Sequence, residues 1–349
     1  MTHGGNVWQG DRPGTWLDHS ANVRPGGPPE WVLEAVRQAA DALEFYPQLS
    51  MARARAALGE YLGLAPDRVL PTAGGISAIT LAARLGCGRV RIPAPSFTEY
   101  AAISRRFGLT VESVPLLNED RSVRPLSALA EDLAEGTCLW LCNPNNPIGV
   151  GFAAEEVMEL HELLRRKNGA LAVDEAFIAY CPENSVAALA AERDNFLVTG
   201  SMTKILGVPG IRLGYLCGGP ALREAESWQT PWELNCFAEA VLLALPDHRD
   251  DVAAECERSR RRREDMRRKL EALGVYVYPS DANYLLIDAG RDVVPLRDYL
   301  RDRHILVREC MDFTAICDGR HLRLAVKDEK SNNTLIETLR EAMACAENH

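Results

Sequence analysis

The chain has 349 residues, of which 47% are hydrophobic and 25% charged, and its formal net charge is −10 at pH 7. This length suits two domains, or one large α/β domain with a smaller partner, and the composition is that of an ordinary globular protein. The acidic balance argues against nucleic acid or an anionic membrane as a partner, although a pocket of opposite local charge can still bind an anion.

Cysteine usage and the N-terminal sequence indicate the compartment. Ten cysteines are scattered along the chain without a Cys-x-x-Cys pair, which predicts reduced thiols and no metal site. Residues 1–6 have neither the basic nor the apolar region of a secretory signal, and no apolar run approaches the roughly 20 residues of a membrane helix. We expect a cytoplasmic protein that binds neither a membrane nor nucleic acid.

The N-terminal part predicts an extended arm followed by a helix. Residues 1–30 are rich in Gly, Pro, Asn and His and show little periodicity, whereas apolar residues recur at helical spacing from Pro29 to Leu43. We expect residues 1–45, the arm and this helix, to join the smaller domain in space.

Between about residues 70 and 220, short apolar runs alternate with amphipathic segments, which is typical of a mostly parallel sheet flanked by helices. The predicted strands are Val90–Ile92, Leu139–Cys142, Leu171–Val173, Phe196–Thr199 and Leu213–Cys217. The predicted helices include Ile76–Leu85, Phe97–Phe107 and Glu155–Lys167. The expected fold class is therefore α/β, with residues 46–240 as the large domain.

After about residue 240 the pattern changes. A long charged helix, about Arg249–Leu273, precedes short strands at Val275–Tyr278 and Tyr284–Ile287 and then further helices and strands. We interpret residues 241–349 as a smaller α+β domain. The arginine-rich stretch 258–268 contains acidic residues and no aromatic ones, so we interpret it as a solvated helix face rather than a nucleic-acid site.

The segment Ser201–Tyr215 says most about function. Lys204 lies after hydroxyl residues and before a loop with glycines and a proline, and Arg212 follows eight residues later. An amine held near a phosphate in this way can form a Schiff base with a carbonyl cofactor. The alternative is a surface loop with an incidental lysine, because short motifs often misfire.

Four polar motifs, Lys204 among them, follow predicted strands, at the edge where open α/β sheets bind ligands. The other three are Asn143–Gly149, Asp174–Phe177 and Gly74-Gly75-Ile76, which opens a helix. Each alone has a structural alternative, namely a plain turn, a helix N-cap or an ordinary loop. Their order at successive strand ends favours a shared ligand.

That ligand is expected to be pyridoxal phosphate. Free N–H groups at a helix start after Gly74-Gly75 suit the cofactor phosphate, to which Ser201 can add a hydroxyl and Arg212 a bidentate guanidinium. The Asp174 carboxylate can keep the pyridine nitrogen protonated, so that the ring acts as an electron sink. Two further candidates face the ring: Asn146 for the phenolic oxygen and Phe97 for stacking.

The order Gly-Gly, aromatic, Asn-Pro-x-Asn-Pro-x-Gly, Asp-Glu-Ala, Ser-x-x-Lys and Arg resembles that of fold-type I pyridoxal-phosphate enzymes of the class I/II aminotransferase superfamily. The resemblance spans nearly the whole chain and implies their architecture, a large domain with a mostly parallel sheet plus a smaller α+β domain. Tyr46-Pro47, Asn283-Tyr284 and Ile305–Arg308 resemble the histidinol-phosphate aminotransferase branch.

More narrowly, the chain resembles the threonine-phosphate decarboxylases of cobalamin biosynthesis. That match rests on His3–Asn6, Asp18–Val23 with Pro25, Gln229–Trp232 with Asn235, Val277–Pro279 and Ala282–Leu286. It implies decarboxylation of L-threonine O-3-phosphate to (R)-1-aminopropan-2-ol O-2-phosphate. Histidinol-phosphate aminotransferase, a serine-phosphate decarboxylase and a non-catalytic cofactor-binding regulator stay open as alternatives.

The resemblance also implies roles for individual residues. Lys204 is the catalytic residue that binds the cofactor covalently. The implied cofactor-binding residues are Gly74, Gly75, Ile76, Phe97, Asn146, Asp174, Ser201, Lys204, Arg212 and, reaching into the other subunit's site of a homodimer, Tyr46. The implied substrate-binding residues are His3, Gly5, Ser20, Asn22, Asn146, Arg308 and Arg323.

Three departures from the family pattern stand out. The phosphate loop reads Gly74-Gly75-Ile76 where relatives often carry a hydroxyl or acidic residue, so the backbone must bind more of the phosphate. Phe177 stands where many aminotransferases have a tyrosine that contacts the phenolic oxygen, which favours a decarboxylase over an aminotransferase. Gln48 stands where an acid is usual, and we draw nothing from it.

Overall fold

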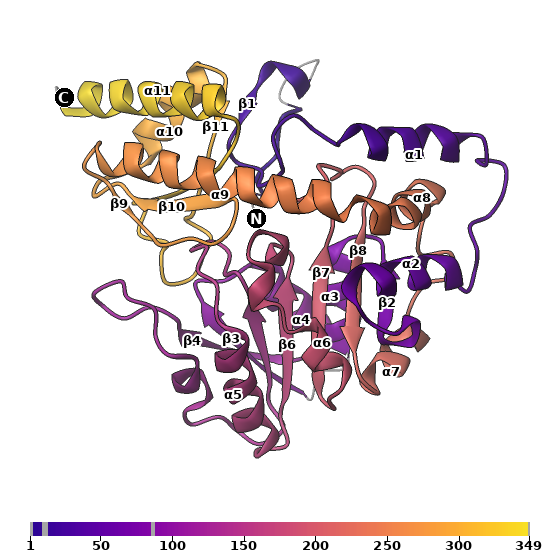
Figure 1. The fold of residues 1–349 in the computed structure, drawn as a ribbon. Helices are drawn as coiled ribbons and strands as arrows, with labels where there is room; N and C mark the ends of the chain where they lie inside the picture. The colour runs from indigo at the N-terminus through magenta and orange to yellow at the C-terminus, as the bar shows by residue number, and fades with distance from the viewer. Residues whose placement is uncertain (1–2, 9–12, 85–87, 348–349) are drawn as a thin grey trace.

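The computed structural model describes residues 3–8, 13–84 and 88–347. Its main element is a seven-stranded sheet in the order β2-β8-β7-β6-β5-β3-β4 (Figure 1). The strands are β2 Val69–Thr72, β3 Arg89–Ala94, β4 Thr110–Pro115, β5 Cys138–Cys142, β6 Ala170–Glu175, β7 Phe196–Ser201 and β8 Gly214–Gly218. Only β8 runs antiparallel to its neighbours, which confirms the predicted mostly parallel α/β sheet.

Helices cover both faces of this sheet. One face carries α3 Gly75–Arg84 and α4 Glu99–Arg106, and the other carries α5 Ala154–Arg165 and α6 Ala187–Ala191 (Figure 1). Further helices at the β2 side are α2 Ala52–Leu62, α7 Ala221–Ser227 and α8 Cys236–Ala244. The predicted helix Ile76–Leu85 corresponds to α3, and its last residue lies outside the described residues.

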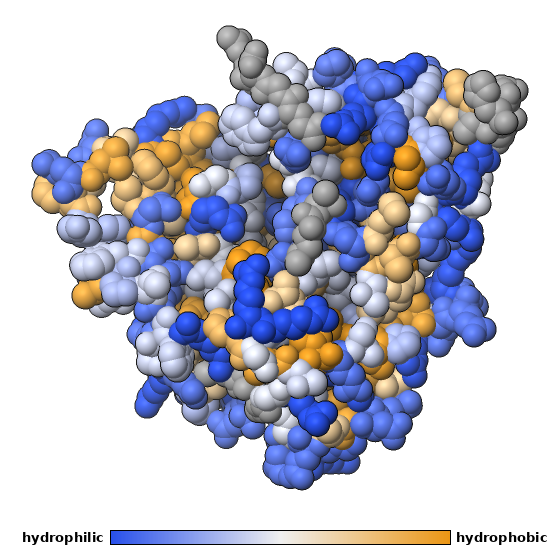
Figure 2. Space-filling view, turned by 180° about the vertical axis from the view of Figure 1, so that it is seen from behind, coloured by the Kyte–Doolittle hydropathy of each residue, from blue (hydrophilic) through white to orange (hydrophobic). Residues whose placement is uncertain are grey.

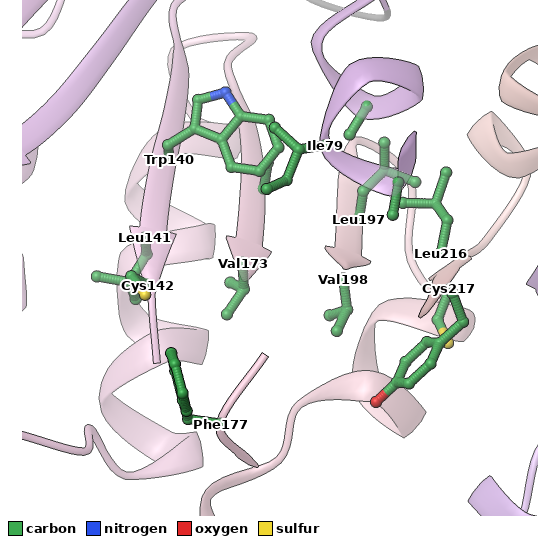
Figure 3. Close-up of a cluster of buried hydrophobic side chains, with 14 of the residues drawn as sticks. Ile79, Trp140, Leu141, Cys142, Val173, Phe177, Leu197, Val198, Leu216 and Cys217 are labelled. Atoms are coloured by element: carbon green, nitrogen blue, oxygen red, sulfur yellow. The ribbon is translucent and has the colours of Figure 1, made fainter. Parts of the chain in front are cut away.

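Strand alternation decides which side chains face the future site. Leu141, Val173, Val198 and Cys217 pair successively across four strands and therefore share one face (Figure 3). Their neighbours in sequence point to the α3 side, and Asp174 is one of them. The same alternation turns Glu175 to the opposite face.

A second body follows the large sheet. Helix α9, Arg249–Glu271, contacts elements of both bodies and leads into a four-stranded sheet in the order β12-β13-β10-β9 (Figure 1). Its strands are β9 Tyr276–Val277, β10 Tyr284–Asp288, β12 Arg308–Glu309 and β13 His321–Ala325, and its helices are α10 Val294–Asp302 and α11 Glu329–Glu347. A separate hydrophobic cluster fills this body.

The N-terminal segment contacts both bodies. Strand β1, Leu17–Asp18, pairs in parallel with β11, Ile305–Leu306. Helix α1, Glu30–Ala40, packs instead on α8, and its Val32 belongs to the core of the large sheet. The domain boundaries at residues 45 and 240 stay predictions.

Two strands of the large sheet, β2 and β4, were not predicted from the sequence. β2 is only four residues long and contains Pro71, and β4 is an edge strand whose residues are partly or fully exposed. Neither therefore produces a continuous apolar run. In the part of the chain that the structure describes, no helix is both long and apolar enough to cross a membrane.

A substitution at Gly200 tests how closely β7 and β8 pack. A Cβ at Gly200 would lie 2.0 Å from Cζ of Tyr215 on the neighbouring strand. We expect Gly200→Ala to lower the free energy of unfolding by about 1–3 kcal/mol through overpacking, measured by thermal and denaturant unfolding.

The matched control is Gly210→Ala, because nothing lies within 4 Å of a Cβ built there. Unfolding of that variant should stay close to wild type. In a Tyr215→Ala background, Gly200→Ala should cost nothing further. Equal stability of Gly200→Ala and Gly210→Ala in the wild-type background would contradict the packing account.

Candidate active site

A cavity of about 380 Å³ lies at the carboxyl ends of β5, β6 and β7, beside the start of α3. It brings together thirteen of the residues predicted from sequence: His3, Ser20, Asn22, Gly75, Ile76, Phe97, Asn146, Asp174, Ser201, Lys204, Arg212, Arg308 and Arg323. Gly5, Gly74 and Tyr46 do not line it.

Asp174 is the acid of this cavity and is 4% exposed. The Tyr100 hydroxyl donates to its Oδ2 at 2.6 Å, and the Ala176 backbone N–H donates to its Oδ1 at 3.0 Å. Tyr100 is itself fixed by stacking on Trp140, with ring centroids 5.0 Å apart. Burial raises the pKa of Asp174, and these hydrogen bonds oppose that rise.

Lys204 follows β7, on the loop after Ser201. Burial lowers the pKa of its amine to about 8, and the nearby Arg323 and Arg212 guanidinium groups act in the same direction. A lysine with a pKa this close to neutrality has a substantial neutral fraction, which nucleophilic attack on a carbonyl requires.

The residues predicted to bind the cofactor phosphate pack closely, and glycines stand at the points of closest approach. Gly74 has φ 86°, and a Cβ there would meet Nη2 of Arg212 at 2.7 Å. Gly214 of β8 approaches so closely that its Cβ would lie 2.5 Å from the Gly74 carbonyl carbon. The Ser201 hydroxyl is hydrogen-bonded at 2.7 Å to Thr203, which also lines the cavity.

Two buried arginines of the smaller body also line the cavity: Arg308 and Arg323, which are 5% and 7% exposed. Arg323 donates to Asn146 Oδ1 at 2.6 Å and to the Ser20 carbonyl at 2.9 Å, while its buried Nε has no partner among the described residues. Arg308 donates to both oxygens of Asp312, at 2.7 and 2.8 Å.

The N-terminal arm closes one side of the cavity. The Ser20 hydroxyl accepts from the Gly5 N–H at 2.8 Å and donates to Asp18 at 2.6 Å, so Gly5 orders the arm from outside the cavity. Asn22 is 3% exposed, and its Oδ1 has no partner in the described structure. His3 pairs with Glu99 at 3.0 Å.

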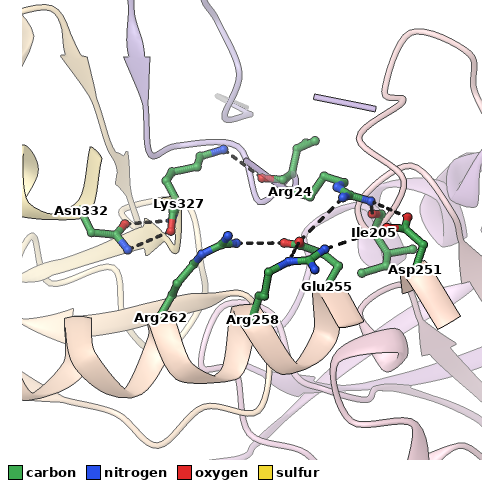
Figure 4. A network of polar contacts seen from close by, with 9 residues as sticks. Arg24, Ile205, Asp251, Glu255, Arg258, Arg262, Lys327 and Asn332 are labelled. Atoms are coloured by element: carbon green, nitrogen blue, oxygen red, sulfur yellow. Dashed lines mark hydrogen bonds and ion pairs between the residues drawn. The ribbon is translucent and has the colours of Figure 1, made fainter. Parts of the chain in front are cut away.

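Arg24 connects the arm to the lysine loop and to α9. Its backbone N–H donates to the Lys204 carbonyl at 3.0 Å, and its guanidinium lies 3.5 and 3.7 Å from Asp251 and Glu255 (Figure 4). Glu255, although 3% exposed, also binds Arg258 and Arg262. Part of the predicted solvated arginine face therefore pairs with the buried Glu255, while the Arg258 side chain itself stays 45% exposed.

Tyr46 lies away from the cavity of its own chain. Its side chain is 81% exposed and rests on Trp232, with ring centroids 4.9 Å apart. Leu43, Phe45 and Leu49 are also exposed, and Figure 2 shows hydrophobic surface over this α1–α2 connection. The predicted contact with another subunit's site is untested, but an apolar patch of this kind is typical of an interaction surface.

Sequence reasoning missed several cavity residues. Thr98, Cys142, Thr203 and Phe313 line the cavity without having been singled out. Thr203 and Cys142 could have been found, because each adjoins a motif that was recognised. Tyr100 and Asp312 act on Asp174 and Arg308 from outside the cavity, and no local pattern indicates such pairs. Phe177, recognised as a departure, does line the cavity.

Comparisons with known proteins identify the family of the chain. A profile of the family described as aminotransferase class I and II matches residues 15–339. Threonine-phosphate decarboxylase of Salmonella typhimurium is 31% identical over 359 residues, covering 98% of this chain and 96% of the relative. Histidinol-phosphate aminotransferase of Symbiobacterium thermophilum is also 31% identical, over 329 residues, covering 92% and 89%.

A solved structure with the same fold is histidinol-phosphate aminotransferase from Sinorhizobium meliloti in complex with pyridoxal-5'-phosphate. It superposes with a TM-score of 0.83 and 22% identity, covering 93% of this chain and 90% of that chain. The two sequence relatives are named for different activities and are equally identical to this chain, so sequence identity alone does not decide between the two activities. Family membership is clear: the chain belongs to the aminotransferase class I and II family of pyridoxal-phosphate-dependent enzymes.

Proposed function

We propose that this enzyme decarboxylates L-threonine O-3-phosphate to (R)-1-aminopropan-2-ol O-2-phosphate in cobalamin biosynthesis. The reaction breaks the bond between the α-carbon and the carboxylate, releases CO2 and adds one proton to the α-carbon. The Salmonella relative of that activity, matched along nearly its whole length, supports the assignment.

The observation that carries the proposal is the charge of the cavity. Its lining contains Lys204, Arg212, Arg308 and Arg323, and among the described residues that line it Asp174 is the single carboxylate, in a chain of net charge −10. Although Asp312 already pairs with Arg308, the lining keeps a cationic surplus, which suits two anionic ligands, the cofactor phosphate and a phosphorylated substrate.

The residues present fit pyridoxal phosphate. The start of α3 and the Arg212 side chain would hold the phosphate, and a Cβ at Gly74 would displace that side chain because it would lie 2.7 Å from Arg212 Nη2. Asp174 would bind the pyridine nitrogen and Asn146 the phenolic oxygen, with Phe97 against the ring. When bound, the cofactor supplies an electron sink for the pair released at the substrate's α-carbon.

The chain's own groups position charge and move a proton. Tyr100 holds Asp174 in place by its 2.6 Å hydrogen bond. Arg323 holds Asn146 at 2.6 Å and the arm at Ser20, so the substrate end and the cofactor end share one cation. Lys204, with its pKa near 8, can hold a proton and deliver it to the α-carbon after CO2 leaves.

Substrate orientation selects the bond that breaks, because that bond must lie perpendicular to the cofactor ring. If Arg308 and Arg323 bind the substrate phosphate rather than its carboxylate, with the arm closed over that phosphate, the carboxylate is free to leave. Among the described residues, the buried Nε–H of Arg323 has no acceptor and is therefore a free donor for an anionic group, whereas the unpartnered Asn22 Oδ1 can accept a hydrogen bond from a donor of the ligand. Phe177 in place of a tyrosine also supports decarboxylation.

Histidinol-phosphate aminotransferase is the main alternative, favoured by the Symbiobacterium relative. It needs the same phosphate site but requires a keto acid for its second half-reaction. A serine-phosphate preference is a smaller change, since one methyl group in a pocket is worth about 1–3 kcal/mol.

The first test is incubation of the loaded enzyme with L-threonine O-3-phosphate in the absence of a keto acid. We expect many turnovers to a product lighter by one CO2, detected by mass spectrometry. Arg323→Ala should lower kcat/KM by at least about 100-fold, because it removes a buried charged donor. Arg320→Ala, which removes a partly exposed arginine paired with Asp288, is the matched control and should turn over normally.

Unchanged turnover by Arg323→Ala would contradict the assignment of that residue. Absence of product, together with amino transfer from histidinol phosphate to 2-oxoglutarate, would identify an aminotransferase. A higher kcat/KM with L-serine O-phosphate would move the proposal to the serine-phosphate alternative.

Cofactor incorporation should report the lowered pKa of Lys204. Below pH 8 the amine is mostly protonated and cannot attack an aldehyde, so we expect the rate of covalent incorporation into apoprotein to rise with pH and level off above about pH 8. Stopped-flow absorbance from pH 6.5 to 10 measures this, with Lys204→Ala as the non-covalent baseline. A rate that still rises steeply beyond pH 9.5 would show that the pKa of Lys204 is not lowered.

We also propose a homodimer in which Tyr46 completes the site of the other subunit. Tyr46→Ala and Lys204→Ala should each be impaired, and mixed subunits should regain activity above the sum of the two, because one site of each mixed dimer is then complete. The measurement is activity after co-refolding, with sedimentation equilibrium for the oligomeric state. Strict additivity, or a monomer, would contradict shared sites.

A further inference from the structure

The segment 229–235 is the part of the predicted motifs to which the reaction assigns no role. It lies outside the cavity, between α7 and α8. Its side chains nevertheless bind three pieces of backbone that build the phosphate end of the site. Gln229 donates to the Pro71 carbonyl of β2 at 2.7 Å, and Asn235 donates to the Ile211 carbonyl, next to Arg212, at 3.0 Å.

Glu233 makes the central contacts of this segment. Its Oε1 accepts from the Ala73 backbone N–H at 3.0 Å and from the Ser77 hydroxyl, and its Oε2 accepts from the Thr230 hydroxyl at 2.5 Å. Ala73 precedes the Gly74-Gly75 turn and Ser77 lies in the first turn of α3. One carboxylate therefore holds the chain on both sides of the glycine turn.

The glycines of this turn add no side-chain packing of their own. Gly74 adopts φ 86°, its N–H donates to the Thr72 carbonyl at 2.7 Å, and its carbonyl accepts from the Thr72 hydroxyl at 3.1 Å. The N–H groups at the start of a helix have no intrahelical acceptor, and in α3 those of Gly75 and Ile76 are the ones beside the cavity. An anchor outside the cavity would fix their direction without occupying the place of a ligand.

We propose that Glu233 is a positioning residue that orients the start of α3 so that the Gly75 and Ile76 N–H groups bind the cofactor phosphate. The inference rests on the phosphate site proposed above. It assigns to Glu233 a role in phosphate affinity alone, because its contacts lie on the phosphate loop and not on Lys204, Asp174 or Asn146.

Geometry and charge make opposite predictions for Glu233. As an anion beside the same helix start, its carboxylate repels the phosphate, whereas as a hydrogen-bond acceptor it orders the donors. Glu233→Gln removes the charge but keeps an amide oxygen that can accept from Ala73. Glu233→Ala removes both. If positioning dominates, only the alanine variant weakens phosphate binding.

The experiment compares the affinity of apoprotein for pyridoxal phosphate and for pyridoxal, which lacks the phosphate, by equilibrium dialysis and fluorescence titration. The ratio of the two Kd values isolates the phosphate contribution. We expect Glu233→Ala to raise the Kd for pyridoxal phosphate roughly tenfold or more, because the partly buried Ala73 and Ser77 donors lose their acceptor, and to leave the Kd for pyridoxal unchanged. Glu233→Gln should stay within about threefold of wild type for both probes.

Glu226→Ala is the matched control, because it removes a nearby carboxylate that pairs with Arg55 rather than with the phosphate loop. It should leave both Kd values unchanged. Equal loss of both probes in Glu233→Ala would indicate general structural damage and overturn the positioning role. No loss of either probe, or tighter phosphate binding in Glu233→Ala, would also overturn it.

Arg212→Met distinguishes failure of this inference from failure of the proposed phosphate site. If the site is correct, Arg212→Met lowers the preference for pyridoxal phosphate over pyridoxal, whatever Glu233 does. If neither Arg212→Met nor Glu233→Ala changes that preference, the phosphate binds elsewhere and both proposals fall. If Arg212→Met alone changes it, only the role of Glu233 is wrong.

Discussion

The buried carboxylate of Asp174 is the constraint on which the rest of the site depends. An ionised group removed from water is costly unless hydrogen bonds and an opposite charge offset the loss of hydration. Tyr100 and the Ala176 N–H provide the hydrogen bonds, and the charge of Lys204 also opposes the rise in the pKa of Asp174. A protonated pyridine nitrogen would supply a further opposite charge, and Asp174 would in turn keep that nitrogen protonated.

Burial also shifts the pKa of Lys204, in the opposite direction to that of Asp174. Burial raises the pKa of Asp174 and lowers that of Lys204, so each group moves toward its neutral form. For the lysine, neutrality is the reactive form. Burial in the same cavity therefore makes Lys204 more nucleophilic and leaves the Asp174 carboxylate in need of a nearby cation. One cofactor with an aldehyde and a protonated ring nitrogen would meet both requirements.

The phosphate end depends on packing where the carboxylate end depends on charge. Gly74 and Gly214 each stand where a Cβ would collide with a neighbour, namely Arg212 or the Gly74-Gly75 backbone. Their close approach brings Arg212 and the start of α3 together. Because glycines add no side-chain packing, the contacts of the segment 229–235 support this turn from outside the cavity.

Much of this was predictable, because polar residues that follow apolar strands must meet at one edge of a parallel sheet. That rule located Asn146, Asp174, Ser201 and Lys204 in one cavity. It could not give pairs that the fold joins over long separations, such as Tyr100 with Asp174, 74 residues apart. Nor could it find β4, whose exposed residues lack an apolar run.

The N-terminal arm shows why the substrate end was harder to derive than the cofactor end. Its backbone carbonyls at Ser20, Ala21 and Val23 are bound by Arg323 and Lys327, cations of the smaller body. Arg323 also faces the cavity and holds Asn146. Arg323 therefore joins the arm, Asn146 and the cavity through one buried cation, and no local sequence pattern indicates contacts over such separations.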